Sequence, residues 1–235
     1  MNTVPPPISV LAASALVKTY GSAIALGGVD FRIGAGESVA IMGASGSGKT
    51  TLLHCLAGII GPDSGSVLFA TPSGTVDVTT LGEKERSRLR REAFGFVFQQ
   101  GFLLPELTAV ENVALPLMLG GTARAVAEQN ASGWLAALGL AGFESRRIGQ
   151  LSGGQAQRVA IARAQVTGAS VVFADEPTGA LDSRTSAEVM SALIDSTTGR
   201  GRSLVVVTHD EEVAARCSRV LRLADGRIVD EAVTA

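Results

Sequence analysis

The glycine-rich stretch at residues 43–50, GASGSGKT, fits the pattern G-x-x-x-x-G-K-[ST]. The mostly apolar residues 37–42 before it predict a buried strand, and the leucines within 49–58 have helical spacing. Glycines allow backbone N–H groups to surround a phosphate, and a helix N-terminus adds positive potential at the same place. Lys49 supplies a cation for the β- and γ-phosphates, and the Thr50 hydroxyl can bind Mg²⁺. The alternative is a Gly/Ser-rich loop that matches the pattern by chance. The strand expected before it and the helix expected after it argue against chance, so we predict a nucleoside triphosphate site here.

Two further stretches carry acidic and imidazole groups that suit phosphate chemistry. Residues 171–176, VVFADE, predict an apolar strand that ends in Asp175 and Glu176. The carboxyl end of a buried strand beside a phosphate loop is a place where proteins hold Mg²⁺, although two solvated acids at a strand end are the simpler alternative. His209 follows a last apolar strand expected at 203–208, where a histidine suits a structural role as well as a site.

A second glycine-containing helix N-terminus is expected further along the chain. The sequence LSGGQ at residues 151–155 precedes a helical run at 156–164, which makes it a second anion-binding element. One chain rarely needs two such cradles for one phosphate group. Tyr20, the only tyrosine, follows a strand expected at 13–19, and it either stacks on a base through its π-face or packs at a domain edge.

The rest of the chain has to bring these groups together, and its pattern is that of an α/β protein. Past Gln99 the segments become mostly apolar helices, broken by Pro116 and by Gly120 and Gly121. We therefore expect a helical subdomain at roughly 101–150, inserted into an α/β core. Strands are expected at 13–19, 29–33, 37–42, 66–70, 94–98, 171–176 and 203–208, and helices at 49–58, 82–93, 108–119, 122–138 and 156–164.

The composition supports a core of small aliphatic residues. Of the 235 residues, 46% are hydrophobic but only 4% are aromatic, so the core must be built from Ala, Val, Leu and Ile, as in buried parallel sheets. The net charge of −2 argues against a general nucleic-acid binder, whose surface would be basic. The arginines at 86–91 alternate with glutamates, which is more typical of a solvated helix face than of a binding patch.

The termini and the cysteines suggest where the protein works. Residues 1–12 are expected to be a flexible leader, because the first nine residues contain three prolines and no basic stretch typical of a signal peptide. No run of about 18 apolar residues occurs, so no membrane span is expected. Cys55 and Cys217 are interpreted as small buried hydrophobes in a reducing compartment rather than as a disulfide. We expect a cytoplasmic protein.

The order of these motifs resembles that of the ATP-binding subunit of an ABC transporter, over about residues 13–233. Gln99 is preferred by register to Gln100 as the family's Q-loop residue. The motifs correspond in turn to the A-loop (Tyr20), Walker A (43–50), the Q-loop (Gln99), the signature (151–155), Walker B with its adjacent glutamate (171–176), the D-loop (179–182) and the H-loop (His209).

Three stretches suggest a branch of this family. Residues 96–99, 103–113 and 175–182 are similar to the ATPases that serve lipoprotein release, macrolide export and antimicrobial-peptide resistance. Gly179 stands where many ABC ATPases carry serine, but not those of this branch. The branch also includes a cell-division relative that drives no transport.

The resemblance implies a single ABC ATPase domain at 13–235, with a P-loop core, a parallel sheet, an N-terminal antiparallel part and the inserted helical subdomain. It implies ATP and Mg²⁺ as cofactors. Thr50, Gln99 and Asp175 would bind the metal ion. Glu176 would polarise the attacking water and His209 would contact the γ-phosphate. Each ATP would be clamped by Lys49 and Thr50 of one chain and by Ser152 and Gly154 of its partner. The full set of residues expected to contact ATP is Tyr20, Gly43, Ser45, Gly46, Ser47, Gly48, Lys49, Thr50, Thr51, Ser152, Gly153, Gly154, Gln155 and Asp182.

The resemblance also implies partners. Two ATP-binding subunits, identical or different, would pair head to tail around two ATP and drive a transmembrane permease from the cytoplasmic face. Contact with the membrane would be only through that permease, and no nucleic acid would be involved. Residues 102–107 are expected to receive a permease helix, unless their leucines simply pack the subdomain. The alternatives are a cell-division type of regulator, a soluble ABC ATPase acting on DNA or ribosomes, and a metabolic P-loop phosphotransferase.

Overall fold

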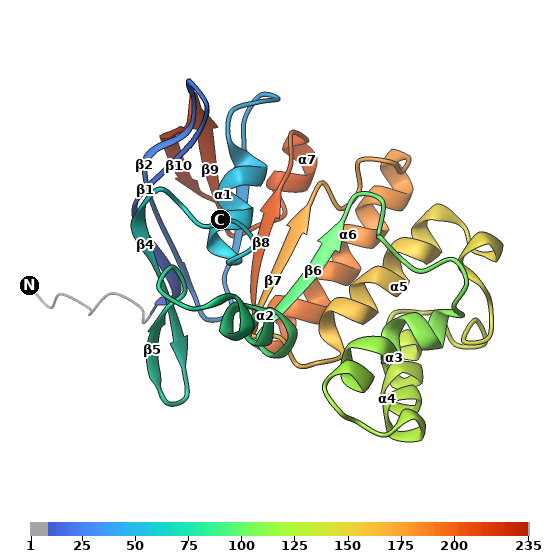
Figure 1. Ribbon diagram of the computed structural model, residues 1–235. Coiled ribbons are helices and arrows are strands. Elements are labelled where there is room, and N and C mark those ends of the chain that lie inside the picture. Colours follow the sequence, from blue (N-terminus) through green and yellow to red (C-terminus); the bar gives the residue numbers. More distant parts are fainter. Residues whose placement is uncertain (1–8, 235) are drawn as a thin grey trace, which may run out of the picture.

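Two β-sheets lie on either side of helix α1 (Lys49–Leu56), as Figure 1 shows. The computed structural model describes residues 9–234. Apolar residues of both sheets pack on α1 through Leu52, Leu53 and Leu56, which are almost completely buried. This arrangement confirms the expected α/β fold with an antiparallel N-terminal part and a parallel core.

The N-terminal sheet is antiparallel, with the strand order β2-β1-β4-β5. Residues 1–8 of the expected leader lie outside the described residues, but the assignment of 9–12 to that leader was wrong. These four residues begin β1, because Leu11 is fully buried against α1 and pairs with Phe69 of β4. The strands are β1 (Ser9–Tyr20), β2 (Ala23–Gly34), β4 (Ser64–Thr71) and β5 (Gly74–Asp77).

The central sheet has the strand order β10-β9-β3-β8-β7-β6, and only β10 runs antiparallel to its neighbour. Since the carboxyl ends of parallel strands meet at one edge, the residues that follow β3, β6, β7 and β8 are brought together there. The strands are β3 (Ser38–Met42), β6 (Phe94–Phe98), β7 (Val171–Asp175), β8 (Ser203–Val207), β9 (Arg219–Ala224) and β10 (Arg227–Val233).

Side-chain alternation along the central strands divides the core in two. In β3, Val39 and Ile41 pack toward α1 and the N-terminal sheet, whereas Ala40 and Met42 pack toward the helices on the opposite face. Strands β7 and β8 alternate in the same way, and both faces are buried. Burial on both faces explains why these strands are continuous apolar runs in the sequence.

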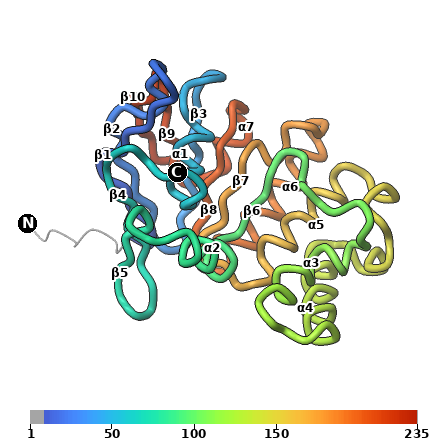
Figure 2. The backbone as a smooth tube through the Cα atoms, in the orientation of Figure 1, coloured from blue at the N-terminus to red at the C-terminus, as the bar shows by residue number. Residues whose placement is uncertain are grey.

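The helices α3 and α4 pack on α5 at the side of the molecule away from the N-terminal sheet, as the backbone tube in Figure 2 shows. Within the described residues, the stretch expected to be a helical subdomain contains these two helices and η1 but no strand; its boundaries stay a prediction. The helices are α2 (Glu83–Glu92), α3 (Ala109–Leu119), α4 (Arg124–Ala137), η1 (Ile148–Gln150), α5 (Gly153–Gln165), α6 (Ser183–Thr197), η2 (Thr198–Arg200) and α7 (Glu211–Ala214).

Helix α3 differs from the expectation that Pro116 would break it. The helix continues to Leu119, because Pro116 removes one backbone N–H close to the C-terminal end, while Val113 and Ala114 stay buried in the core. Gly120 then ends the helix as expected.

The charged helix α2, the two cysteines and the apolar character of the helices were also subjects of expectations from the sequence. Helix α2 buries none of its residues, so its arginines and glutamates form a solvated face, with Glu83 paired to Arg86 and Arg90. Cys55 and Cys217 are free and buried, and burial raises their thiol pKa to about 11 and about 12. Between residues 9 and 234, no helix has both the length and the apolar character needed to cross a membrane.

Candidate functional site

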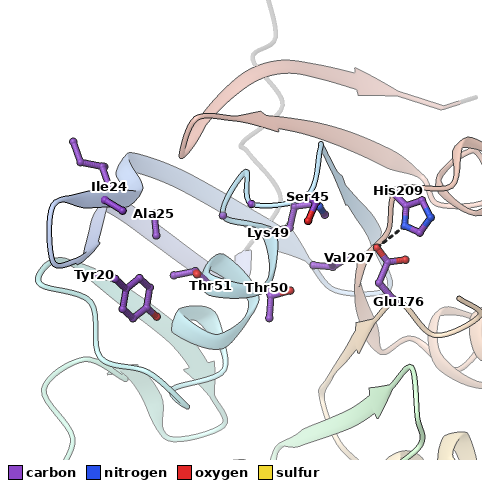
Figure 3. Close-up of a pocket in the computed structure, with 13 residues that line it drawn as sticks. Tyr20, Ile24, Ala25, Ser45, Lys49, Thr50, Thr51, Glu176, Val207 and His209 are labelled. Atoms are coloured by element: carbon purple, nitrogen blue, oxygen red, sulfur yellow. Dashed lines mark hydrogen bonds and ion pairs between the residues drawn. The ribbon is translucent and has the colours of Figure 1, made fainter.

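A cavity of about 760 Å³ lies between the carboxyl edge of the central sheet and the tip of the N-terminal sheet (Figure 3). Tyr20 and Ile24 stand on one side of it in this view, and Glu176 and His209 stand on the other. The lining residues are Tyr20, Ala23, Ile24, Ala25, Ser45, Gly46, Gly48, Lys49, Thr50, Thr51, Glu176, Val207 and His209.

The phosphate loop, residues 43–50, follows β3 and needs its glycines for space and for backbone conformation. Gly43 and Gly48 have φ values of 154° and 102°. A Cβ atom would lie 2.2 Å from the carbonyl oxygen of Leu223 at Gly43, and 2.2 Å from that of Ala25 at Gly48. At Gly46, with φ 78°, a Cβ would meet nothing within 4 Å, since this residue lines the cavity. At Gly43 and Gly48, only glycine allows the backbone to lie this close to a neighbouring carbonyl group.

Lys49 provides a cation at the base of the loop. Its side chain is 8% exposed, and Nζ donates hydrogen bonds to the carbonyl oxygens of Gly43 (2.8 Å) and Ala44 (2.9 Å). Among residues 9–234 no carboxylate lies within ion-pair distance of Nζ. Its direct hydrogen-bond partners are therefore neutral carbonyl groups, which leaves its charge available for a bound polyanion such as a triphosphate.

Thr50 and Asp175 form a pair of oxygen donors beside the loop. The Thr50 hydroxyl donates to Asp175 Oδ1 at 3.3 Å, and Asp175 ends β7 in register with Val207 of β8. Burial raises the pKa of the Asp175 carboxyl, and the hydrogen bond from Thr50 acts in the opposite direction. Mg²⁺ typically takes one or two protein oxygens and keeps its other positions for phosphate and water, so this donor set fits it.

Glu176 and His209 face each other at the end of the sheet. His209 Nδ1 lies 2.9 Å from Glu176 Oε1, and the Thr208 hydroxyl donates to Glu176 Oε2 at 3.4 Å. Glu176 has a φ of 47°, and its backbone N–H donates to the Val207 carbonyl at 2.9 Å. A left-handed conformation at a glutamate costs about 1–3 kcal/mol, which the neighbouring strand must offset. The carboxylate is thus held at the cavity wall.

Tyr20 follows two residues that a hydrogen-bond network holds at the end of β1. Asp63 accepts hydrogen bonds from Lys18 Nζ (2.8 Å) and from the backbone N–H (2.7 Å) and hydroxyl (2.8 Å) of Thr19. These bonds, first that from Lys18, lower the pKa of Asp63 to about 2. Tyr20 is 50% exposed and lines the cavity, which favours the interpretation that its ring stacks on a base.

Gln99 follows β6 and lies against the D-loop, not among the lining residues. A Cβ atom on Gly179 would come within 2.9 Å of Gln99 Nε2. The absence of a side chain at Gly179 therefore leaves room for Gln99 in its present position.

The signature, residues 151–155, lies at the N-terminus of α5. Ser152 caps the helix through a hydrogen bond from the Gln155 N–H (3.3 Å), and Gln155 Oε1 accepts from the Ser152 N–H (2.9 Å). A Cβ at Gly154 would lie 2.4 Å from Thr185 Cγ2, so only glycine lets α5 approach α6 this closely.

Of the other predicted contact residues, Gly153 faces Leu181 of the D-loop, and Asp182 caps α6 by accepting from the Thr185 N–H at 3.0 Å. Neither of them, nor Ser152, Gly154 or Gln155, lines the cavity.

The structure thus brings together only part of the predicted set. Gly43 and Ser47 lie in the loop but behind its surface, where Gly226 of the β9–β10 turn donates to the Ser47 carbonyl at 3.1 Å. Sequence reasoning missed Thr208, the lining residues 23–25 of β2 and this supporting turn. The dipeptide Asp225-Gly226, a common hairpin signal, would have revealed the turn.

The comparisons with known proteins agree with this geometry. The ABC transporter family matches residues 26–179. The pyoverdine export ATP-binding/permease protein PvdT of Pseudomonas fluorescens and the macrolide export ATP-binding/permease protein MacB of Nitrosomonas europaea are both 49% identical over 209 residues. Each match covers 89% of this chain but 31% of the relative, so the chain spans about a third of their length.

Two solved structures share the fold over nearly the whole chain. A dimeric structure of MJ0796, a bacterial ABC transporter cassette, has a TM-score of 0.85 and 38% identity and covers 96% of this chain and 99% of its own. A dimeric post-hydrolysis state of the same cassette, bound to ADP and Pi, has a TM-score of 0.84 at the same identity and coverage. This chain therefore belongs to the ABC transporter family, as an ATP-binding and ATP-hydrolysing cassette.

Proposed function

We propose that this cassette dimerises around two ATP molecules and drives a membrane permease that exports a substrate or extracts it from the membrane. The observation that supports this most directly is the position of the signature. The phosphate loop, Glu176 and His209 share one cavity, but the signature glycines lie outside it. A second copy that presents its signature to the open side of the cavity gives those glycines a function.

The polar side chains in and beside the cavity have chemical roles in this proposal. Lys49 and the loop N–H groups bind the phosphates, and Thr50 and Asp175, with Gln99, would hold Mg²⁺. When bound, that ion neutralises phosphate charge. Glu176 accepts a proton from the attacking water, and His209 orients Glu176 and contacts the γ-phosphate. Dimer closure excludes water and strengthens these interactions.

The export branch is proposed from the functions of two relatives. PvdT and MacB are export ATP-binding/permease proteins, and this chain matches about a third of each. We infer that the permease function belongs to another segment or another chain, and that the cassette lies at the cytoplasmic face of the membrane. A cell-division type of regulator is the second candidate, since it would use the same cassette.

Two measurements separate this function from a phosphotransferase. Phosphate release from ATP without any added acceptor, together with ATP-dependent dimerisation, is the expected result. Dependence of phosphate release on an acceptor, with a monomer at saturating ATP, would contradict the proposal.

Tyr20 gives a prediction about the nucleotide base. If its exposed ring stacks on adenine, Tyr20→Ala should weaken ATP binding by about 1–3 kcal/mol, whereas Tyr20→Trp should be tolerated because it keeps a π-face. Titration with a fluorescent ATP analogue measures both affinities. Equal losses in the two variants would show that Tyr20 matters for packing instead.

Residues 102–107 give a prediction about the permease. Phe102 is 63% and Leu104 is 43% exposed, while Leu103 packs partly on the core. Asn112, which is fully buried, fixes this segment by accepting from the Leu104 N–H (2.8 Å) and donating to the Leu104 carbonyl (3.0 Å). The segment is thus a rigid surface with exposed apolar groups beside the acidic Glu106.

Glu106→Lys tests this surface, because one exposed charge should change stability by no more than about 0.5 kcal/mol. We expect ATP binding to persist while permease association, or permease-coupled ATPase activity, falls. Glu92→Lys, at an exposed glutamate of α2 with no ion pair among the described residues, is the control for a charge reversal elsewhere on the surface. If Glu106→Lys binds and activates the permease normally, the contact lies elsewhere.

A further inference from the structure

Helix α5 holds the turn that contains Gln99 on both sides. Before the turn, Gln157 Nε2 donates to the Phe98 carbonyl at 3.0 Å. After it, Arg163 donates through Nη2 to the Gly101 carbonyl (2.6 Å) and through Nη1 to the Phe102 carbonyl (2.7 Å). Three backbone carbonyls of one turn therefore accept from side chains of one helix.

The donor side chains of Gln157 and Arg163 have few other hydrogen-bond partners. The Gln157 side chain is 5% exposed, and burial lowers the pKa of the Arg163 guanidinium. Within residues 9–234 no carboxylate is at ion-pair distance from Arg163. Two carbonyl dipoles thus balance its charge, and hydrogen bonds from a charged donor are stronger than neutral ones.

The turn itself depends on this support. Its residues Gly101 and Phe102 both have positive φ values, 66° and 44°. The left-handed conformation is unfavourable for a phenylalanine, so it persists where the surroundings impose it. The two bonds from Arg163 act on the carbonyls of these two residues, and they therefore hold the turn in shape.

Helix α5 also begins at the signature. Ser152 caps it, and its first residues are Gly153 and Gly154. A helix of this length moves as a rigid element, so a shift of the Gln99 turn must either carry α5 along or break the bonds to Gln157 and Arg163. The Gln99 turn and the signature are therefore mechanically connected within one chain.

We propose that Arg163 and Gln157 are positioning residues that couple the Gln99 turn to the signature, so that nucleotide in a chain's own cavity sets the signature that this chain offers to its partner. This inference rests on the dimer of the proposed function. Neither residue touches the cavity, so neither is expected to change ATP binding by the single chain.

The test uses ATP-driven dimerisation of the Glu176→Gln protein, measured by sedimentation, with and without Arg163→Gln. Coupling between sites typically changes affinity by about 5- to 150-fold, so we expect dimerisation to weaken at least about tenfold while ATP binding by the monomer stays within about twofold. Arg163→Lys keeps the charge but not the two-pronged donor, and should recover part of the loss. Arg90→Gln, which removes a guanidinium–carbonyl bond of 2.6 Å to Gly58, is the matched control and should not weaken dimerisation.

Combination with Gln99→Ala separates coupling from simple support of the fold. If Arg163 acts through the Gln99 turn, adding Arg163→Gln to Gln99→Ala should cost less than about threefold further, because interacting residues are not additive. An unchanged dimer in Arg163→Gln, or fully additive losses, would overturn the inference. Should Arg163→Gln fail to fold, Gln157→Leu is judged by the same two criteria. Failure of the Glu176→Gln parent to dimerise would instead refute the proposed function.

Discussion

Replacement of Glu176 by glutamine is expected to stop ATP turnover while ATP binding is retained. The carboxylate at the cavity wall, paired with His209 Nδ1 at 2.9 Å, is the group placed to accept a proton from water. An amide of the same shape cannot accept that proton, and loss of a general base typically lowers the rate by about 10²- to 10⁴-fold. Phosphate release and binding of a fluorescent ATP analogue measure the two quantities.

The control for this substitution is Glu212→Gln, a surface glutamate of α7 outside the cavity. It should hydrolyse ATP at the parent rate. Should Glu176→Gln also hydrolyse ATP at close to that rate, Glu176 would not be the base and the assignment of the catalytic group would have to change.

Lys49→Ala is expected to lose ATP binding itself, and with it every later step. Lys49 is 8% exposed and its ammonium group donates to two backbone carbonyls, so its removal takes away the main cation of the phosphate loop. Hydrogen bonds to charged groups contribute about 1.5–3 kcal/mol each, so two lost phosphate contacts weaken binding by at least about 100-fold. Calorimetric titration with ATP measures this loss.

Lys84→Ala is the matched control, because Lys84 is an exposed lysine of α2 away from the cavity. Its ATP affinity should equal that of the parent. A Lys49→Ala protein that still dimerises on addition of ATP would contradict the role of the phosphate loop in closing the dimer.

The phosphate loop and the acidic strand end could be predicted because their chemistry is local. Seven of the residues from 43 to 50 are Gly, Ser, Lys or Thr, and this composition at fixed spacing has few other uses. Strands β3, β7 and β8 are short apolar runs since both of their faces are buried, and such runs are visible without any knowledge of the fold.

Helix α6 and the hairpin β9–β10 were not predicted. Helix α6 is rich in serine and threonine, which favour caps and turns, and it is stabilised by burial of Val189, Met190 and Leu193 against the central sheet and α5. Strand β10 is almost fully exposed, and its apolar residues are adjacent in pairs rather than alternating with polar ones as in a half-buried strand. Tertiary contacts determine α6, whereas the only local signal for the hairpin is its Asp225-Gly226 turn.

The environment of Tyr20 could not be predicted either. The choice between stacking and packing depends on Asp63, which is distant in sequence and fixes the end of β1 through Thr19. The contact between α5 and the turn that contains Gln99 could not be predicted for the same reason, because Arg163 lies 62 residues beyond Gly101, whose carbonyl it binds. Such long-range contacts leave no periodic signal in the sequence.

The central claim is that two copies pair head to tail, with the phosphate loop of one facing the signature of the other. Cysteine cross-linking tests it directly, because the native Cys55 and Cys217 are buried with thiol pKa values of about 11 and about 12 and do not compete. Ser45, in the phosphate loop, and Gln150, just before the signature, are both exposed and can each be replaced by cysteine.

In the Glu176→Gln background, the protein with both Ser45→Cys and Gln150→Cys is treated with a short bismaleimide, with and without ATP. The account predicts an ATP-dependent covalent dimer that forms with the paired cysteines and is absent with either cysteine alone. A dimer that forms equally well with Ser45→Cys alone, or no dimer at saturating ATP, would contradict head-to-tail pairing.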